Sequence, residues 1–174
     1  KAETYYQFLN QVPVDSDPTT FSVLNVGDDF GFPRKDFLVN EGTGENYGFE
    51  LTIEKFFSKG YYALLTTSIY DSNYEASDGV KRNTSFNNSY ILNILGGKEW
   101  TFGKTKNNAI TFDMNLTYAG GRYYIPIDLE ASRQAGEMVR DQANAYTVRH
   151  PDYFRLDAKI GYRLNSTKRK FSQT

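Results

Sequence analysis

The chain of 174 residues contains no cysteine and a single histidine, His150. The lack of cysteine excludes disulfide frameworks and thiolate metal sites. One histidine leaves any zinc or transition-metal site dependent on carboxylates, and the acidic residues show no metal-ligand spacing. No nucleophile motif accompanies His150, so the residues that a hydrolytic triad needs are missing. The sequence therefore predicts a protein without metal or cofactor that is not an enzyme.

Neither sign of charge is in excess, since 20 Lys and Arg stand against 21 Asp and Glu. A balanced chain gives no electrostatic reason to expect a nucleic-acid partner. The chain also lacks any run of 18 apolar residues, which excludes a transmembrane helix. Any contact with a membrane has to be made by another kind of element.

Aromatic residues and alternating polarity are abundant. The chain has 14 Tyr, 13 Phe and 14 Gly. Apolar and polar side chains alternate along residues 109–118 and again along 154–164, and alternation with period two is typical of a strand with one apolar and one polar face. The apolar positions of these two runs are Ile110, Phe112, Met114, Leu116, Tyr118, Phe154, Leu156, Ala158, Ile160, Tyr162 and Leu164.

These runs are longer than the strands of most soluble proteins, which have ~5–6 residues. We expect five long strands, over residues 38–57, 61–74, 89–102, 109–124 and 153–165, with a shorter strand over 2–9. A strand of about fourteen residues tilted by ~40° rises ~35 Å, which exceeds the ~25 Å apolar band of an outer membrane. Length and alternation thus favour strands that cross a membrane, with lipid on one face and water on the other.

The connections alternate in length. Residues 58–60, 103–108 and 165–170 read as short turns, whereas 75–88 and 125–151 read as long loops, the second with one or two turns of helix. Since antiparallel strands reverse at each turn, the short turns fall on one rim and the long loops on the other, as in outer-membrane barrels. Gly96 and Gly97 predict a bend or bulge inside a strand.

Most of the chain beyond residue 44 resembles the C-terminal barrel region of TonB-dependent outer-membrane receptors of the Bacteroidetes type. The segments that carry the resemblance are GENYGFELTIEKFF (44–57), YYALLTTSIYDSNY (61–74), DGVKRNTSFN (78–87), LGGKEW (95–100), GGRYYIPIDLEAS (120–132) and HPDYFRLDAKIGYRLN (150–165). The resemblance implies an all-β fold, an antiparallel transmembrane β-barrel segment that is part of a 22-stranded barrel. It also implies the outer membrane of a Gram-negative bacterium as the location.

The resemblance further implies a function in transport. Such receptors import scarce solutes, namely iron-siderophore complexes, cobalamin or glycans, and draw energy through TonB. The expected partners are outer-membrane lipid, the imported solute, the plug domain of a parent receptor and TonB. Residues 1–174 contain no plug domain and no recognisable TonB-binding segment, and the expected closing strands are missing after Thr174. We therefore expect a C-terminal portion of a larger receptor.

The predicted ligand-binding region is the beginning of the longest loop, because Arg and Tyr are common anchors of recognition surfaces. Its residues, together with one arginine of the last strand, are Arg122, Tyr123, Tyr124, Asp128, Arg133 and Arg155. An interfacial aromatic belt with a solvated loop is an equally good interpretation of the loop residues. For Arg155, a cross-strand ion pair is the simpler interpretation, because Asp157 interrupts the row of basic side chains on the same face of the last strand.

Two other classes of protein stay open. A soluble all-β ligand-binding domain, either a sandwich or a lipocalin-like barrel, would bury Phe112, Leu116, Leu156 and Ile160 in a core. A barrel in a membrane would expose all four on its outer surface as one band. An outer-membrane enzyme would require His150 to lie within hydrogen-bonding distance of a Ser or Thr and of a carboxylate.

Overall fold

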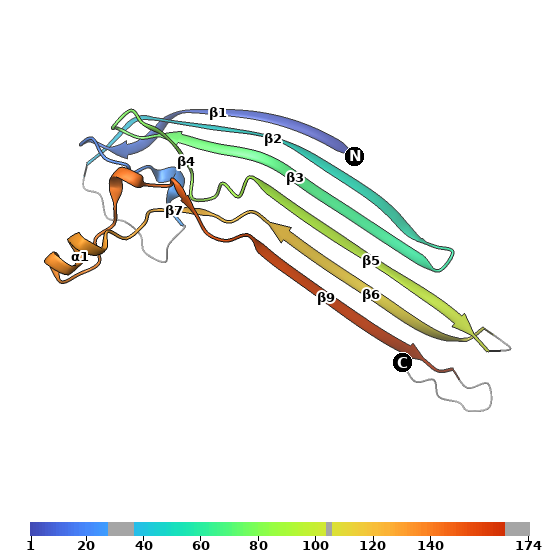
Figure 1. Cartoon of the computed structure of the whole chain (residues 1–174). Coiled ribbons are helices and arrows are strands. Elements are labelled where there is room, and N and C mark those ends of the chain that lie inside the picture. Colours follow the sequence, from blue (N-terminus) through green and yellow to red (C-terminus); the bar gives the residue numbers. More distant parts are fainter. Residues whose placement is uncertain (28–36, 104–105, 166–174) are drawn as a thin grey trace.

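A computed structural model describes residues 1–27, 37–103 and 106–165, which form one long antiparallel sheet (Figure 1). Its neighbours follow the chain in the order β1-β2-β3-β5-β6-β9. The bounds are Ala2–Asp15 for β1, Leu38–Ser58 for β2, Tyr61–Glu75 for β3, Tyr90–Phe102 for β5, Asn108–Ala119 for β6 and Tyr153–Arg163 for β9. The predicted antiparallel all-β class is confirmed, and the sheet is open within the described residues, with β1 and β9 at its edges.

The smaller elements belong to the long connections. They are η1 (Val23–Asn25), β4 (Lys81–Asn83), β7 (Tyr123–Tyr124), α1 (Leu129–Ala135), η2 (Gln142–Asn144) and β8 (Val148–Arg149). Strand β4 pairs with the end of β3, and β7 pairs with β8. Figure 1 shows these elements gathered at one end of the sheet, with the β2–β3 and β5–β6 turns at the other. The predicted separation of long loops from short turns is therefore confirmed. No helix among the described residues is long and apolar enough to cross a membrane.

The strand bounds differ from the prediction in two places. Strand β1 continues past Leu9 to Asp15, because a register shift between Leu9 and Val12 accommodates Gln11 at a φ of 57° and pairing resumes beyond it. The run predicted over 109–124 ends at Ala119. Beyond it the chain passes so close to other backbone that a Cβ at Gly120 or Gly121 would collide with a carbonyl oxygen. The turn predicted over 165–170 lies, beyond its first residue, outside the described residues.

The register places apolar side chains beside one another across the sheet. One continuous cross-strand row, from β2 to β9, consists of Ile53, Leu65, Ile94, Leu116 and Leu156. The next row along the strands lies on the opposite face and consists of Thr52, Thr66, Asn93, Thr117 and Arg155. We call these two sides the apolar face and the polar face. Alternation within each strand and register between strands thus agree, and together they produce a two-faced sheet.

The apolar face is not covered by any other part of the described chain. Phe112, Leu116, Leu156 and Ile160 share this face, as the register of β6 with β9 requires. Ile160 is 78% exposed and Leu156 is 53% exposed. A soluble sandwich would bury such residues against a second sheet. The structure therefore agrees with the band that a membrane barrel needs and gives no support to the soluble alternative.

Gly97 has a packing role and does not mark a bulge. Pairing of β5 runs without a register shift through Gly96 and Gly97 against both β3 and β6, so a bulge at this position, one of the two predicted alternatives, is wrong. The ring of Tyr62 lies over Gly97 on the polar face, and its hydroxyl donates a hydrogen bond of 2.9 Å to Asp113. Gly97 provides the space that this cross-strand contact requires.

We expect Gly97→Ala to lower the free energy of unfolding by about 1 kcal/mol relative to Gly96→Ala, as a hydrogen bond to a carboxylate is lost. A Cβ at Gly97 would collide with Asp113 Oδ1 and lie 2.5 Å from the Tyr62 ring, whereas at Gly96 the nearest atom is the Tyr62 carbonyl oxygen at 3.4 Å. Chemical denaturation of the two variants measures the difference. Equal midpoints would show that the Tyr62–Asp113 contact contributes nothing.

Candidate functional site at the long-loop end

The long connections fold onto the polar face at their end of the sheet. Tyr74 of β3 is on the polar face, and its ring packs edge-on against Tyr146 of the last loop, with centroids 5.8 Å apart. The Tyr74 hydroxyl donates a hydrogen bond of 2.9 Å to the carbonyl oxygen of Thr20 in the first loop. Leu24 lies over Gly44, another polar-face position. Two loops far apart in sequence thus meet above one end of the polar face.

These contacts build the main buried apolar cluster among the described residues. Its members, which we call the loop core, are Val14, Tyr74, Ala76, Ala145 and Tyr146. Leu24, Val39, Tyr123 and Ile125 pack against it. Apolar burial in this sheet is therefore concentrated where the loops fold inward, and the loop core fixes their position relative to the strands.

The predicted residues at the beginning of the longest loop lie on the β7–β8 hairpin. Tyr123 packs on the loop core, and Arg149 lies over its ring with Cζ 5.4 Å from the centroid. Tyr124 stacks on the His150 ring at a centroid distance of 4.3 Å. Arg122 is exposed, with its guanidinium 5.5 Å from the centroid of the Phe86 ring. The hairpin thus brings these three residues close together, with only Arg122 well exposed to solvent.

Asp128 and Arg133 belong to helix α1. Asp128 is the N-cap residue, and its Oδ1 accepts hydrogen bonds from the backbone N–H groups of Glu130 and Ala131 at 3.0 and 2.9 Å. Such a cap stabilises a short helix by satisfying two free donors. Arg133 is highly exposed, and within the described residues its one ion pair is a long one of 3.8 Å with Glu130. Within this helix the aspartate is structural, and the Arg133 side chain projects into solvent.

Arg155 lies apart from the loop residues, on β9. Its guanidinium makes two hydrogen bonds to the Asp157 carboxylate, at 2.8 and 3.2 Å. This ion pair joins neighbouring polar-face positions of one strand, so the cross-strand pairing predicted for Arg155 is replaced by pairing along the strand. A true cross-strand pair forms further along, where Arg163 Nη2 lies 3.0 Å from Glu99 Oε1.

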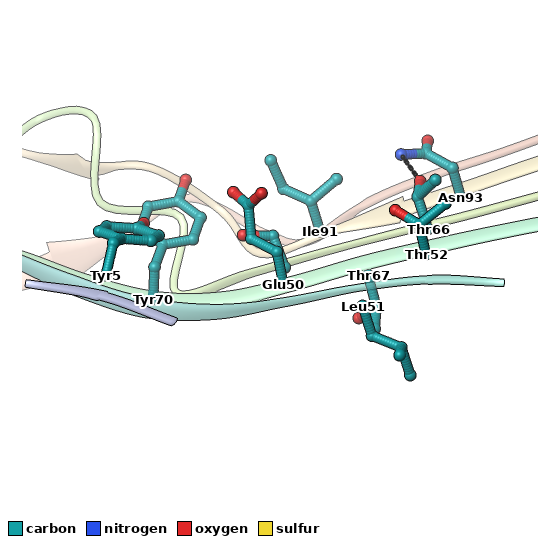
Figure 2. A pocket seen from close by; sticks show the side chains of 10 residues that line it. Tyr5, Glu50, Leu51, Thr52, Thr66, Thr67, Tyr70, Ile91 and Asn93 are labelled. Carbon is teal, nitrogen blue, oxygen red and sulfur yellow. Dashed lines mark hydrogen bonds between the residues drawn. The ribbon is translucent and has the colours of Figure 1, made fainter. Parts of the chain in front are cut away.

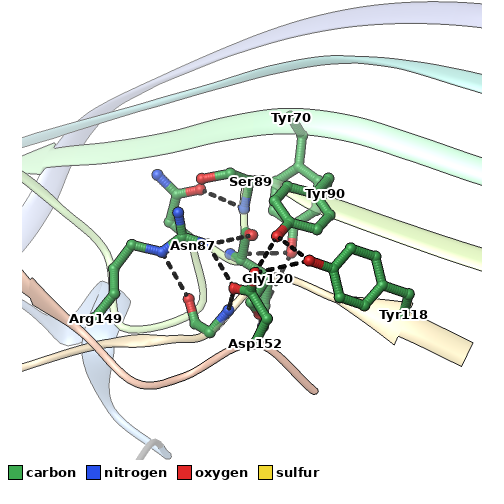
Figure 3. A network of polar contacts seen from close by, with 10 residues as sticks. Tyr70, Asn87, Ser89, Tyr90, Tyr118, Gly120, Arg149 and Asp152 are labelled. Atoms are coloured by element: carbon green, nitrogen blue, oxygen red, sulfur yellow. Dashed lines mark hydrogen bonds and ion pairs between the residues drawn. The ribbon is translucent and has the colours of Figure 1, made fainter. Parts of the chain in front are cut away.

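Asp152 is the residue that ties the longest loop to the strands, and the sequence analysis missed it. Figure 3 shows its carboxylate beside the hydroxyl groups of Tyr90 and Tyr118. It accepts hydrogen bonds from the Tyr90 hydroxyl at 2.5 Å, the Tyr118 hydroxyl at 3.0 Å and the Gly121 N–H at 3.1 Å. Its position directly before the first residue of a strand was the only signal in the sequence.

Arg149 completes this anchor. Its Nη2 lies 3.6 Å from Asp152 Oδ1, and its Nε donates a hydrogen bond of 3.2 Å to the Gly121 carbonyl oxygen. Asn88, from the β3–β5 loop, donates a hydrogen bond of 2.7 Å to the carbonyl oxygen of Gly120. The two long loops are therefore joined where they leave the sheet.

The carboxyl groups of Asp152 and Asp78, one in each long loop, have a lowered pKa. The hydrogen bond from Tyr90, assisted by those from Gly121 and Tyr118, lowers the pKa of Asp152 from its ordinary 3.8. The hydrogen bond from Arg82 lowers the pKa of Asp78, and this ion pair of 2.7 Å is well buried, with side chains 10% and 19% exposed. Both carboxylates are charged at neutral pH, where they hold their loops.

The described residues contain no cluster of three or more His, Cys, Asp or Glu side chains that could hold a metal ion. His150 contacts Tyr124 through its ring, and its backbone N–H donates a hydrogen bond of 2.9 Å to the carbonyl oxygen of Arg122. In the described part of the chain its ring makes no hydrogen bond to a Ser, Thr or carboxylate. The described residues around His150 therefore do not meet the geometric condition for a catalytic triad.

We expect Asp152→Asn to loosen the β6–β9 loop at neutral pH, because an amide cannot replace the charge-assisted acceptor. The lowered pKa means that this stabilisation is present above pH 3.8 and is lost as the pH falls below it. Hydrogen–deuterium exchange of the loop amides, corrected for intrinsic rates, should be faster in the variant at pH 7, and the difference from wild type should shrink as the pH falls below 3.8 through the lowered pKa of Asp152. Asp157→Asn is the control, and equal exchange in all three proteins at pH 7 would contradict the anchor.

Comparison with known proteins agrees with the geometry. The family model described as "TonB dependent receptor-like, beta-barrel" matches residues 3–172. No curated protein and no solved structure gives a significant match. The family match covers almost the whole chain and accounts for the long antiparallel strands, the two-faced sheet and the long loops on one rim. The chain belongs to the TonB-dependent receptor β-barrel family, whose members are outer-membrane transporters and receptors of Gram-negative bacteria.

Proposed function

We propose that this chain forms part of the wall of a TonB-dependent transporter that imports a scarce solute, either an iron-siderophore complex, cobalamin or a glycan. The observation that carries the proposal is the continuous apolar row across five strands, backed by a polar row on the opposite face. A sheet of this kind suits a wall between lipid and a water-filled lumen.

The ends of the apolar face support its contact with lipid. Tyr61, Trp100 and Tyr162 lie near the short turns, and Lys55 Nζ is 3.9 Å from the centroid of the Tyr61 ring. Tyr6, Tyr47 and Tyr90 lie near the long loops. Amphipathic rings at both ends of an apolar band are typical of residues at the two membrane interfaces, with lysines extending toward the headgroups.

The polar face and the missing parts of a receptor define the proposed partners. We infer that the chain is a C-terminal portion of a larger receptor whose plug domain would contact the polar face, and whose N-terminal region would bind TonB. Polar-face side chains such as Thr52, Glu54 and Asn115 are suited to water or to a polar plug surface. The edges β1 and β9 would then pair with further strands of the same barrel, which removes their exposed backbone groups.

We further propose that the β6–β9 loop contacts the solute before import. Arg122 and Arg133 are two of its exposed cationic side chains, and the Tyr124 ring, stacked on His150, follows Arg122 on the same hairpin. Tyr123 and Asp128 would act indirectly, the first through the loop core and the second through the helix cap. Arg155 would contact solute only after leaving Asp157, at a later point along the lumen.

Cysteine labelling tests the orientation of the sheet, since the chain has no cysteine of its own. We expect Leu156→Cys and Ile160→Cys, in the parent receptor in outer membranes, to resist a charged water-soluble maleimide. Asp157→Cys and Lys159→Cys should react through the lumen. Reactivity should alternate from one residue to the next, because successive side chains of β9 lie on opposite faces of the sheet. Uniform reaction of all four, or faster reaction at Leu156 and Ile160, would contradict a lipid-facing apolar side.

Solute uptake tests the loop. Because Ile127 pairs with Arg140 at the base of the helical part, residues 128–139 can be replaced by an Asn-Gly turn without stretching the chain. Cells carrying the parent receptor should accumulate one solute from a panel of ferric siderophores, cobalamin and oligosaccharides. We expect the shortened loop to reduce that uptake at least tenfold at limiting solute, while the receptor keeps heat-modifiable gel mobility.

Two results would contradict these proposals. Unchanged uptake after loop replacement would exclude the loop as a binding element. Failure of the intact receptor to import any member of the panel would exclude all three solute classes.

A further inference from the structure

A groove crosses the polar face between β1 and β5, some distance from the loop core. It has a volume of about 510 Å³. Figure 2 shows Tyr5, Tyr70 and Glu50 projecting side by side from the sheet, with Thr52, Thr66 and Asn93 further along the same face. A volume of this size is within the ~300–1,000 Å³ range of small-molecule pockets and exceeds what one amino-acid side chain fills.

Glu50 is the one carboxylate among the residues that line the groove, and the Lys1 ammonium group, which pairs with Glu3, is close enough to interact with it electrostatically. Its cross-strand neighbour on β1 is Glu3, which pairs with Lys1 at 2.8 Å. On β3 its neighbour is Ser68. Among the described residues the Glu50 carboxylate makes no hydrogen bond and no ion pair. The groove therefore presents a carboxylate that no direct hydrogen bond or ion pair within the described residues occupies.

Tyrosine rings border this carboxylate. Tyr70 is held in place, because its hydroxyl donates to the Phe86 carbonyl oxygen at 3.3 Å and accepts from the Asn88 N–H at 3.3 Å. Tyr5 lies over Gly48, where a Cβ would approach its hydroxyl to 2.8 Å, and the described chain gives its ring no stacking partner. An aromatic ring beside a carboxylate is the arrangement that a guanidinium or ammonium group prefers, since it can pair with the charge and lie on the ring.

The far side of the groove supplies neutral hydrogen-bonding groups. Asn93 Nδ2 donates to Thr66 Oγ1 at 3.3 Å, and the Thr117 hydroxyl donates to Asn93 Oδ1 at 3.0 Å. No cationic side chain lines the groove. An anion would meet only repulsion from Glu50, so charge selects against phosphate and carboxylate ligands and in favour of cations.

We propose that this groove is a binding site for a small organic cation whose guanidinium or alkylammonium group pairs with Glu50 and stacks on Tyr5. The site rests on the proposed function, because the groove opens into a lumen only when the polar face of the sheet lines that lumen. The site accepts one chemical class inside the barrel, the organic cations, either as whole solutes or as the cationic part of a larger solute.

The test compares two probes that differ in charge and hardly in shape, butylguanidinium and butylurea. Isothermal titration calorimetry with the purified parent receptor should show binding of butylguanidinium at least ~10-fold tighter than binding of butylurea, the ratio expected for a charge-assisted hydrogen bond. Glu50→Gln should remove this preference. Glu54→Gln is the matched control, because it makes the same change of charge on the same face of β2, outside the groove.

A second pair of variants tests the ring. Tyr5→Phe should keep most of the affinity for butylguanidinium, whereas Tyr5→Leu should weaken it severalfold without abolishing the preference over butylurea. Equal affinity of the wild-type receptor for both probes, no measurable binding of butylguanidinium, or equal losses in Glu50→Gln and Glu54→Gln would each overturn the proposal. Heat-modifiable gel mobility shows that every variant is folded.

The cation site and the proposed transport function can be disproved separately. A receptor that imports a solute and passes the cysteine test, yet binds neither probe, would retain the proposed function and lose the cation site. A chain whose Leu156 and Ile160 positions react freely with aqueous maleimide would lose the lumen itself, and with it both proposals.

Discussion

Cross-strand register is the constraint on which the rest of this structure depends. A strand shows opposite faces at successive residues, so a shift by one residue would move every apolar side chain of that strand to the polar side. The row from Ile53 through Leu116 to Leu156 is apolar at each of its five positions, and the adjacent row from Thr52 to Arg155 is polar at each. Any shift by one residue would mix the two rows, and this is how a sheet with almost no buried core keeps its two faces apart.

The loops acquire their positions by a different kind of interaction. At their end of the sheet the chain buries Val14, Tyr74 and Tyr146 together, and it joins the β3–β5 and β6–β9 loops through Asn88, Arg149 and Asp152. Burial and hydrogen bonding therefore position the loops beyond the point where the alternation of apolar and polar residues ends. Because the loop core sits on the polar face, the long loops extend over the inside of the proposed barrel, which is where a binding surface would meet an incoming solute.

The features that depend on local sequence patterns were predictable, whereas the features that depend on contacts between distant segments were not. Strand identity, the two faces and the two rims depend on period two and on loop length, which any single chain displays locally. The continuation of β1 beyond Leu9 depends on a register shift at Gln11, and the break after Ala119 depends on backbone from Asn88 and His150. Asp152 and Glu50 gain their importance from neighbours on other strands. These contacts are non-local, so no segment of sequence carries them.

Side-chain volume gives a reason, separate from charge, for the polar face to be the inner one. Gly48, Gly97 and Gly161 all project toward the polar face, where they make room for Tyr70, Tyr62 and Thr111 on neighbouring strands. On the apolar face, β6 and β9 carry Phe112, Leu116, Leu156 and Ile160, and the row through Ala63, Gly96 and Ala158 is the one with small residues. Closing a sheet crowds the side chains on its concave side, so small residues paired with large ones belong inside. The same pairing, at Gly48, sets Tyr5 beside Glu50, so the packing that suits a curved wall also shapes the groove within it.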